Sequence, residues 1–151
     1  MDNNELLRSG FRYAYSLCHD YHDAEDYVQQ AWFKLHRKYG RVDTKALLFK
    51  TIRNLRMDRI RRDKIVAFEP MEEREFDSAE EVRASKDDVK AILSQLRDGE
   101  REALYLNVVE GYTAQEISEM THTPRGSVLS LIHRAKNKLK GGLLKGYDRT
   151  I

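Results

Sequence analysis

The stretch TAQEISEMTHTPRGSVLSLIHRAKNKLK, residues 113–140, decides how this chain of 151 residues is interpreted. Thr113 and Glu116 have the spacing of a capping box, in which two side chains satisfy amides that would otherwise lack partners at the start of a helix. The pattern breaks at residues 121–123, and Pro124 suits the first turn of a second helix, where its missing N–H is no loss. The stretch therefore predicts two helices joined by a tight turn.

The second of these helices has two faces of opposite character. Val128, Ile132 and Ala135 recur at i, i+4 and i+7, so they lie on one side and face a core. Short polar and cationic side chains cover the other side, which is how a helix-turn-helix enters the major groove of DNA. Arginine, serine and histidine reach base edges, whereas lysines meet phosphates. The candidate DNA-binding side chains are Arg125, Ser127, Ser130, His133, Arg134, Lys136 and Lys138.

A helical hairpin that only packs, with a solvated basic face, is the alternative interpretation. Leu129 and Leu131 favour it, because they fall at outward or flanking positions where a DNA reader would hold cations. His122 stands in the turn, where glycine usually supplies a left-handed backbone; histidine adopts that conformation at some cost. On this stretch alone the alternative stays open.

Three more helices are predicted in the first part of the chain. The helical period of apolar residues covers residues 5–19, 23–39 and 45–64. Acidic side chains fill the first turn of the second helix, which suits the positive end of its dipole. Gly40 is suited to end that helix, and Asp43 or Thr44 to cap the next one.

The helix predicted over residues 23–39 carries a strip that suits a protein partner. Asp26, Gln30 and Phe33 follow one another at i, i+4 and i+7, and Gln29 lies beside them. An exposed aromatic ring beside acids and amides is typical of a protein-binding surface. A plain amphipathic core helix with an acidic start is the alternative.

Cations crowd the helix predicted over residues 45–64. Arg53 and Arg56 lie outside the apolar stripe of this helix and suit a phosphate backbone. Asn54 offers a donor and an acceptor to a base edge. The alternative is a solvated charged face, in which Asp58 pairs with one of the arginines that follow it.

Charge divides the chain into parts. Residues 1–64 carry 14 Lys and Arg against 9 Asp and Glu, whereas residues 65–95 carry 4 against 9. Residues 65–85 also lose the helical pattern, which is typical of a flexible linker. Two basic blocks therefore flank an acidic connector, and phosphate-binding surfaces are expected in the blocks.

The helical period returns after the connector and no strand pattern competes with it. It covers residues 89–96, breaks at residues 97–99 and resumes over residues 100–110 before Gly111. The predicted fold class is all-α, with two small helical domains joined by a flexible acidic linker. The domains are expected over residues 1–66 and 89–145, with the linker at residues 67–88.

Several function classes find no support in the sequence. No apolar run approaches the roughly 20 residues of a membrane span, and the first residues lack the pattern of a secretory signal. Cys18 is the only cysteine, so no internal disulfide forms and a cytoplasmic location is the simplest. We find no metal-ligand cluster, Ser-His-Asp arrangement or glycine-rich phosphate loop, and expect no enzyme activity, cofactor or metal.

Three motifs, in their order along the chain, resemble one known family. DAEDYVQQAWFKLHR at residues 23–37 resembles region 2.2 of the extracytoplasmic-function (group 4) sigma factors of bacterial RNA polymerase, in the sigma-70 family. ALLFKTIRNLRMDRIRRD at residues 46–63 is similar to regions 2.3 and 2.4. Residues 101–140, which contain EGY, EISE and HRAK, are similar to region 4.

The resemblance implies partners and roles. Promoter DNA and core RNA polymerase would be bound, the latter through the clamp helices of its largest subunit and the flap of its second-largest, and an anti-sigma factor is a further candidate partner. Contact with core polymerase would fall to Asp26, Gln29, Gln30 and Phe33. Contact with the minus-ten element would fall to Arg41, Lys50, Arg53, Asn54, Arg56, Met57, Asp58, Arg61 and Arg62. The candidate side chains of the last helix would read the minus-thirty-five element.

Two other functions compete with a promoter-specificity subunit. A sigma-like decoy would bind polymerase or an anti-sigma factor without reading a promoter, and the leucines of the last helix favour it. A simple helix-turn-helix repressor, usually a dimer on a palindrome, leaves the whole N-terminal module unexplained.

Overall fold

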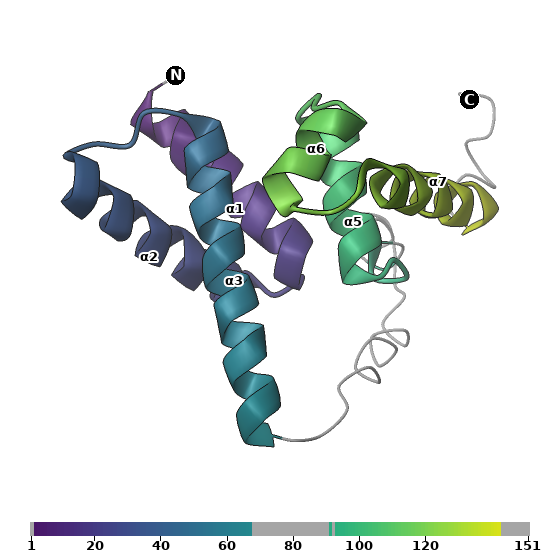
Figure 1. Cartoon of the computed structure of the whole chain (residues 1–151), viewed down its shortest axis with the longest axis horizontal. Helices are drawn as coiled ribbons and strands as arrows, with labels where there is room; N and C mark the ends of the chain where they lie inside the picture. Colours follow the sequence, from purple (N-terminus) through teal and green to yellow (C-terminus); the bar gives the residue numbers. More distant parts are fainter. Residues whose placement is uncertain (1, 68–90, 92, 143–151) are drawn as a thin grey trace. The chain divides into compact units, whose positions relative to one another are not determined.

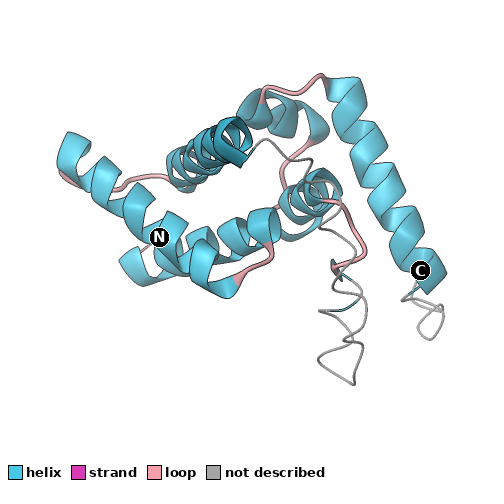
Figure 2. Cartoon of the chain, turned by 90° about the horizontal axis from the view of Figure 1, so that it is seen from below, coloured by secondary structure: helices cyan, strands magenta, loops and turns pink. Residues whose placement is uncertain are grey.

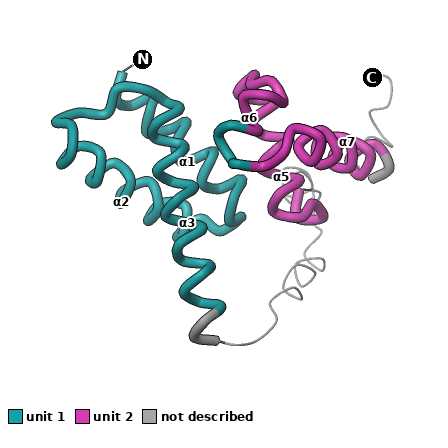
Figure 3. Tube along the Cα trace, in the orientation of Figure 1, with its two compact units in different colours: residues 1–69, 119–122 teal, residues 70–118, 123–151 magenta. Residues whose placement is uncertain are grey.

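The computed structural model describes residues 2–67, 91 and 93–142. Within these ranges every regular element is a helix and no strand occurs, which confirms the all-α prediction (Figures 1 and 2). The chain forms two compact units, residues 1–69 with 119–122 and residues 70–118 with 123–151 (Figure 3). The predicted linker lies outside the described ranges except for residue 67, so its boundaries stay predictions.

The first unit contains three helices that begin on side-chain caps. They are α1 (Asn3–Cys18), α2 (Tyr21–Tyr39) and α3 (Lys45–Ala67). The α2 cap is Asp20, whose Oδ1 accepts from the amide of Asp23 at 2.9 Å, so α2 begins two residues before the predicted start. Of the two caps proposed for α3, Thr44 is the one used: its Oγ1 accepts from the amide of Leu47 at 3.2 Å. Gly40 ends α2 with φ of 84°, as predicted.

The core of the first unit lies where α1, α2 and α3 meet. The ring of Tyr13 stacks on Phe49 with 4.4 Å between centroids, and both residues are buried. Gly10 permits the close approach of α1 and α3, because a Cβ at this position would lie 2.9 Å from Leu48 Cδ2. The buried apolar residues of this unit are Leu6, Tyr13, Ala14, Leu17, Ala24, Tyr27, Val28, Ala31, Leu35, Val42, Leu48, Phe49 and Ile52. Leu55 and Ile60, apolar residues further along α3, are only half-buried.

The helix predicted over residues 89–96 lies partly outside the described residues, and the second unit differs from the prediction at α5. Residues 97–99 were expected to break the helical pattern, but α5 (Asp98–Leu104) already contains Asp98 and Gly99. The helix begins early because the carboxylate of Glu100 accepts from the amide of Arg97 at 3.0 Å. The expected helix over residues 100–110 then widens into the π-helix η2 (Tyr105–Val109), and Gly111 turns the chain with φ of 81°.

The helix-turn-helix agrees with its sequence signals. It consists of α6 (Ala114–Thr121) and α7 (Arg125–Gly142). The capping box is present: Thr113 Oγ1 accepts from the Glu116 amide at 3.1 Å, and Glu116 Oε1 accepts from the Thr113 amide at 2.9 Å. His122 adopts the left-handed conformation expected of the turn, with φ of 56°. Pro124 stands just before α7 and its carbonyl accepts from Val128 at 3.1 Å.

The core of the second unit is built chiefly by α5 and α7, which pack together. Its buried apolar residues are Leu96, Ala103, Leu106, Ile117, Val128, Ile132 and Ala135. The inner face predicted for the last helix is therefore confirmed, and its opposite face is left to solvent. None of the described helices is long and apolar enough to cross a membrane.

We predict that Gly10→Val destabilises the first unit. The added side chain must displace Leu48 or separate α1 from α3, and overpacking of this kind costs about 1–3 kcal/mol. Trp32 is the only tryptophan and belongs to α2, so its fluorescence during urea denaturation reports on this unit.

Arg8→Val is the matched control, because it also adds a valine to α1 of this unit, at an exposed position. Equal midpoints for wild type and Gly10→Val would show that the helix contact at Gly10 imposes no steric limit.

Candidate functional site

The strip predicted on α2 is exposed, and a hydrogen bond joins two of its side chains. Gln30 Nε2 donates to Asp26 Oδ2 at 2.8 Å, one turn apart on the surface. The ring of Phe33 is 63% exposed, and the Arg37 guanidinium lies 5.2 Å from its centroid. Gln29 is exposed as well. The four predicted side chains are thus available to a partner, and a large apolar ring left in water is a feature of protein-binding surfaces.

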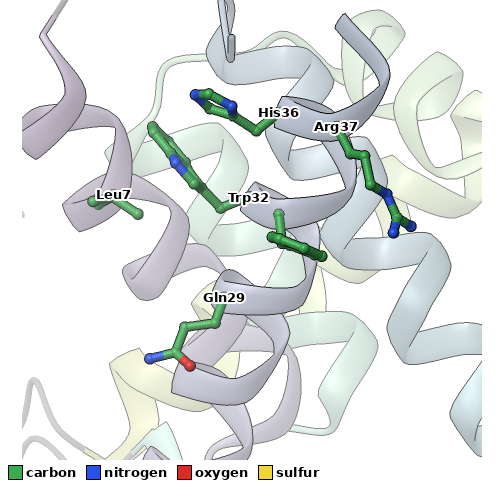
Figure 4. A pocket seen from close by; sticks show the side chains of 6 residues that line it. Leu7, Gln29, Trp32, His36 and Arg37 are labelled. Atoms are coloured by element: carbon green, nitrogen blue, oxygen red, sulfur yellow. The ribbon is translucent and has the colours of Figure 1, made fainter. Parts of the chain in front are cut away.

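A shallow pocket opens beside this strip between α1 and α2 (Figure 4). It has a volume of about 490 Å³ and is lined by Leu7, Gln29, Trp32, Phe33, His36 and Arg37. Leu7 comes from α1 and the other five come from α2. Sequence reasoning did not identify Trp32 as part of a surface, but it is half-buried and lines the pocket. The only available signal was its position next to Phe33.

The candidate residues predicted on α3 and in the loop before it fall into two groups. Arg41, Lys50, Asn54, Asp58, Arg61 and Arg62 are exposed, whereas Arg53, Arg56 and Met57 are half-buried. Asp58 Oδ1 pairs with Arg61 Nη1 at 3.2 Å, as the alternative interpretation expected for this aspartate. Both side chains are more than half exposed, so the pair contributes little to stability and leaves the arginine accessible. Arg41 Nε pairs with Asp43 at 2.9 Å in the exposed loop.

Arg59 is a structural cation that the sequence did not single out. Its Nη2 lies 3.3 Å from Asp23 Oδ1 and its Nη1 lies 4.0 Å from Asp26 Oδ2. Its guanidinium also lies 5.1 Å from the centre of the Tyr27 ring. Arg59 therefore fastens α3 to the acidic start of α2.

The outer face of α7 matches the prediction for most of its residues. Arg125, Ser127, Ser130, His133 and Lys136 are exposed. His133 Nε2 lies 3.2 Å from Asn137 Nδ2, one turn further along the helix. Leu129 is 44% exposed on this face, whereas Leu131 is half-buried and lies 3.6 Å from the position of a Cβ at Gly99. Leu131 is thus a packing residue between α7 and α5.

The two remaining predicted cations of α7, Arg134 and Lys138, contact a buried carboxylate. Glu100 is 1% exposed; its Oε1 accepts from Lys138 Nζ at 2.7 Å, and its Oε2 lies 3.5 Å from Arg134 Nε. Burial raises the pKa of this carboxyl, but hydrogen bonds from Lys138 and the Arg97 amide and the charge of Arg134 lower it to below its ordinary value. Sequence reasoning missed Glu100, because no local pattern links residues 34 or 38 positions apart.

The comparisons with known proteins agree with these two modules. The Sigma-70 region 2 family model matches residues 4–65, and the family model described as Sigma-70, region 4 matches residues 86–139. The chain is 29% identical over 164 residues to the ECF RNA polymerase sigma factor SigE of Mycolicibacterium smegmatis, covering 97% of this chain but 63% of that protein. It is 27% identical over 147 residues to the ECF RNA polymerase sigma factor SigM of Bacillus subtilis, covering 91% and 90%.

A solved structure shares the fold. The sigma factor RpoE of Bartonella quintana, crystallised in complex with the anti-sigma factor NepR, matches with a TM-score of 0.71 and 25% identity. The match covers 95% of this chain and 94% of the other. The all-α fold and both modules are therefore shared with a known class of proteins.

We predict that Glu100→Gln reduces the loss of stability in acid. The pKa of Glu100 is lower in the folded chain than its ordinary value of 4.5, so its ion pairs stabilise the fold above that pH. That contribution is lost as the pH falls from about 4.5 through the lower pKa of the folded state. Hydrogen exchange at the amides of Ile132 and Ala135, followed by NMR, measures the opening of this unit at each pH.

The glutamine variant keeps the size and the acceptor of the side chain but cannot titrate. Its opening free energy should fall less steeply with acid than that of wild type. If the opening free energy fell equally steeply with acid in the two proteins, the pKa of Glu100 would not be lowered in the folded chain.

Proposed function

The chain belongs to the extracytoplasmic-function group of the sigma-70 family, and on this premise we propose that it gives RNA polymerase promoter specificity in transcription initiation. The observation that carries the proposal is the combination of three surfaces on one chain: the aromatic strip of α2, the cationic face of α3 and the helix-turn-helix of α6 and α7. A DNA-binding protein that acts alone has no need of the first.

Core polymerase is the partner proposed for α2. The strip of Asp26, Gln29, Gln30 and Phe33 offers carboxylate and amide groups around one exposed ring, with an apolar pocket beside it. Such a surface suits a helical partner that brings apolar side chains to the pocket and cations or amides to its rim. The clamp helices of the largest polymerase subunit are the proposed docking element, and the flap of the second-largest subunit is proposed for the second unit.

The minus-ten element is the ligand proposed for α3 and the loop before it. Lys50, Arg61 and Arg62 are exposed cations that suit phosphates, and exposed Asn54 suits the edge of an unpaired base. Arg53, Arg56 and Met57 lie closer to the helix stripe, where they would line the path of the strand. Asp58 remains a candidate because its partner Arg61 is itself exposed.

The minus-thirty-five element is the ligand proposed for α7. The N-terminal half of the helix presents Arg125, Ser127 and Ser130 to solvent, and its middle presents His133 and Lys136. This is the half of a recognition helix that enters the major groove.

Run-off transcription with purified core polymerase and a pool of random promoter DNA tests the proposal. Transcripts that start at a common sequence and depend on the added protein support it. A sigma-like decoy is the second candidate. Exposed Leu129 favours it, and so does Lys138, which donates to Glu100 within the chain. Tight binding to core polymerase without any transcript would favour the decoy.

We predict that Asn54→Ala weakens promoter opening more than binding to closed duplex. Asn54 is exposed on α3, and removing its amide leaves the phosphate-binding cations in place. Permanganate reactivity of thymines measures opening, and a filter-binding assay measures duplex affinity. Lys38→Ala is a control, because that exposed cation lies at the end of α2. If Asn54→Ala reduced promoter opening and duplex affinity equally, Asn54 would have no specific role in opening.

We predict that Phe33→Ala lowers affinity for core polymerase by at least tenfold. Truncation of a central aromatic anchor typically costs about 2 kcal/mol or more. The side chain is 63% exposed in the free chain, so its loss should leave folding intact. Tyr39→Ala is the matched control, since Tyr39 is 56% exposed on the same helix but outside the strip. Unchanged affinity for Phe33→Ala would exclude the strip as the docking surface.

A further inference from the structure

The environment of Glu100 distinguishes its two carboxylate oxygens. Oε1 accepts from the Arg97 amide at 3.0 Å and from Lys138 Nζ at 2.7 Å. Oε2 faces Arg134 Nε at 3.5 Å. One oxygen is thus occupied by the cap of α5 and by a lysine, and the other meets the arginine of the recognition helix.

Arg134 bridges this buried carboxylate and solvent. The side chain of Glu100 is 2% exposed, whereas that of Arg134 is 56% exposed. The contact uses Nε, the nitrogen nearest the helix, and the guanidinium carries four further N–H donors on its two terminal nitrogens. Those terminal nitrogens form the fork that binds a guanine edge or a phosphate with two parallel hydrogen bonds.

We propose that Glu100 is a positioning residue, which holds Arg134 by its Nε so that the terminal nitrogens are presented to DNA. The inference rests on the proposed function, because it assigns a ligand to the exposed face of α7. A guanidinium already fixed on one side loses less conformational freedom on binding than a free one. Lys138, which is 38% exposed, has the separate role of balancing the charge at Oε1.

The geometry also permits the opposite role, in which Glu100 withdraws Arg134 from DNA by competing with phosphate. Two features favour positioning. The Nε contact is a single ion pair at 3.5 Å, whereas a competing carboxylate would occupy the fork itself. Lys138 at 2.7 Å already offsets the negative charge, so Glu100 repels an approaching phosphate less.

The first test uses the free full-length chain. NMR of arginine side chains resolves the Nε–H group of Arg134, which is assigned by its loss in Arg134→Ala. In wild type we expect this Nε–H to exchange with solvent more slowly than the Nε–H groups of other exposed arginines, and in Glu100→Gln to exchange at their rate, because the ion pair at 3.5 Å shields it. Fast exchange in wild type would overturn the proposal without any reference to DNA.

The second test is a double-mutant cycle on a duplex that contains the minus-thirty-five sequence recovered by run-off transcription. Arg134→Ala should lower affinity at least fivefold in a fluorescence anisotropy titration. Glu100→Gln should lower affinity about threefold or more when Arg134 is present, and should have no effect when residue 134 is alanine.

Two other outcomes overturn the proposal. Equal losses in both backgrounds would show that Glu100 acts only through the stability of the unit. Tighter binding by Glu100→Gln would show that the carboxylate competes with DNA. Lys140→Met is the matched control, because it removes an exposed cation of α7 that is not among the candidate DNA-binding residues, and it should leave the coupling of Glu100 with Arg134 intact.

The outcomes also separate this inference from the proposed function. If the wild-type chain starts no transcripts with core polymerase, the promoter function fails, and the exchange of the Arg134 Nε–H still decides whether Glu100 holds it. If transcription proceeds and the cycle shows no coupling, only the positioning role fails.

Discussion

A helix that carries many cations must keep them in water and still pack against a core, and ion pairs at the start of a neighbouring helix meet this constraint in both units. In the first unit Arg59 of α3 contacts Asp23 at the start of α2. In the second unit Arg134 and Lys138 of α7 contact Glu100 at the start of α5. Carboxylates near a helix N-terminus are already favoured by the dipole, so these acids serve as fixed counter-charges.

The Asp23–Arg59 pair and the ion pairs of Glu100 differ in burial, so the loss of a partner has different effects in the two units. Asp23 and Arg59 are more than one-third exposed, so solvent screens their attraction. The contact therefore mainly sets the orientation of the Arg59 side chain. Glu100 has a side chain that is 2% exposed, so removing its partners would leave a charge inside the unit. The first unit has the stacked rings of Tyr13 and Phe49 in its core, whereas the second encloses a carboxylate between two cations.

Local signals made most of the fold predictable. The capping box at Thr113, the stop at Gly40 and the strained turn at His122 each involve residues within four positions of one another, and the structure contains all three. Contacts across the chain were not predictable, which is why Glu100 and the pocket beside Trp32 were missed. The assigned DNA and polymerase contacts stay predictions, since burial and hydrogen bonds describe only the free chain.

The π-helix η2 has a consequence for how this chain can vary in length. A π-turn holds one residue more than an α-turn. Here the wide turn spans Tyr105–Val109, and the Tyr105 hydroxyl donates to the carboxylate of Glu110 across it. Loss of one residue from this segment would convert it into an ordinary helical turn and leave α5 and the capping box of α6 intact. Related chains that are one residue shorter here are therefore expected to keep the same helix-turn-helix.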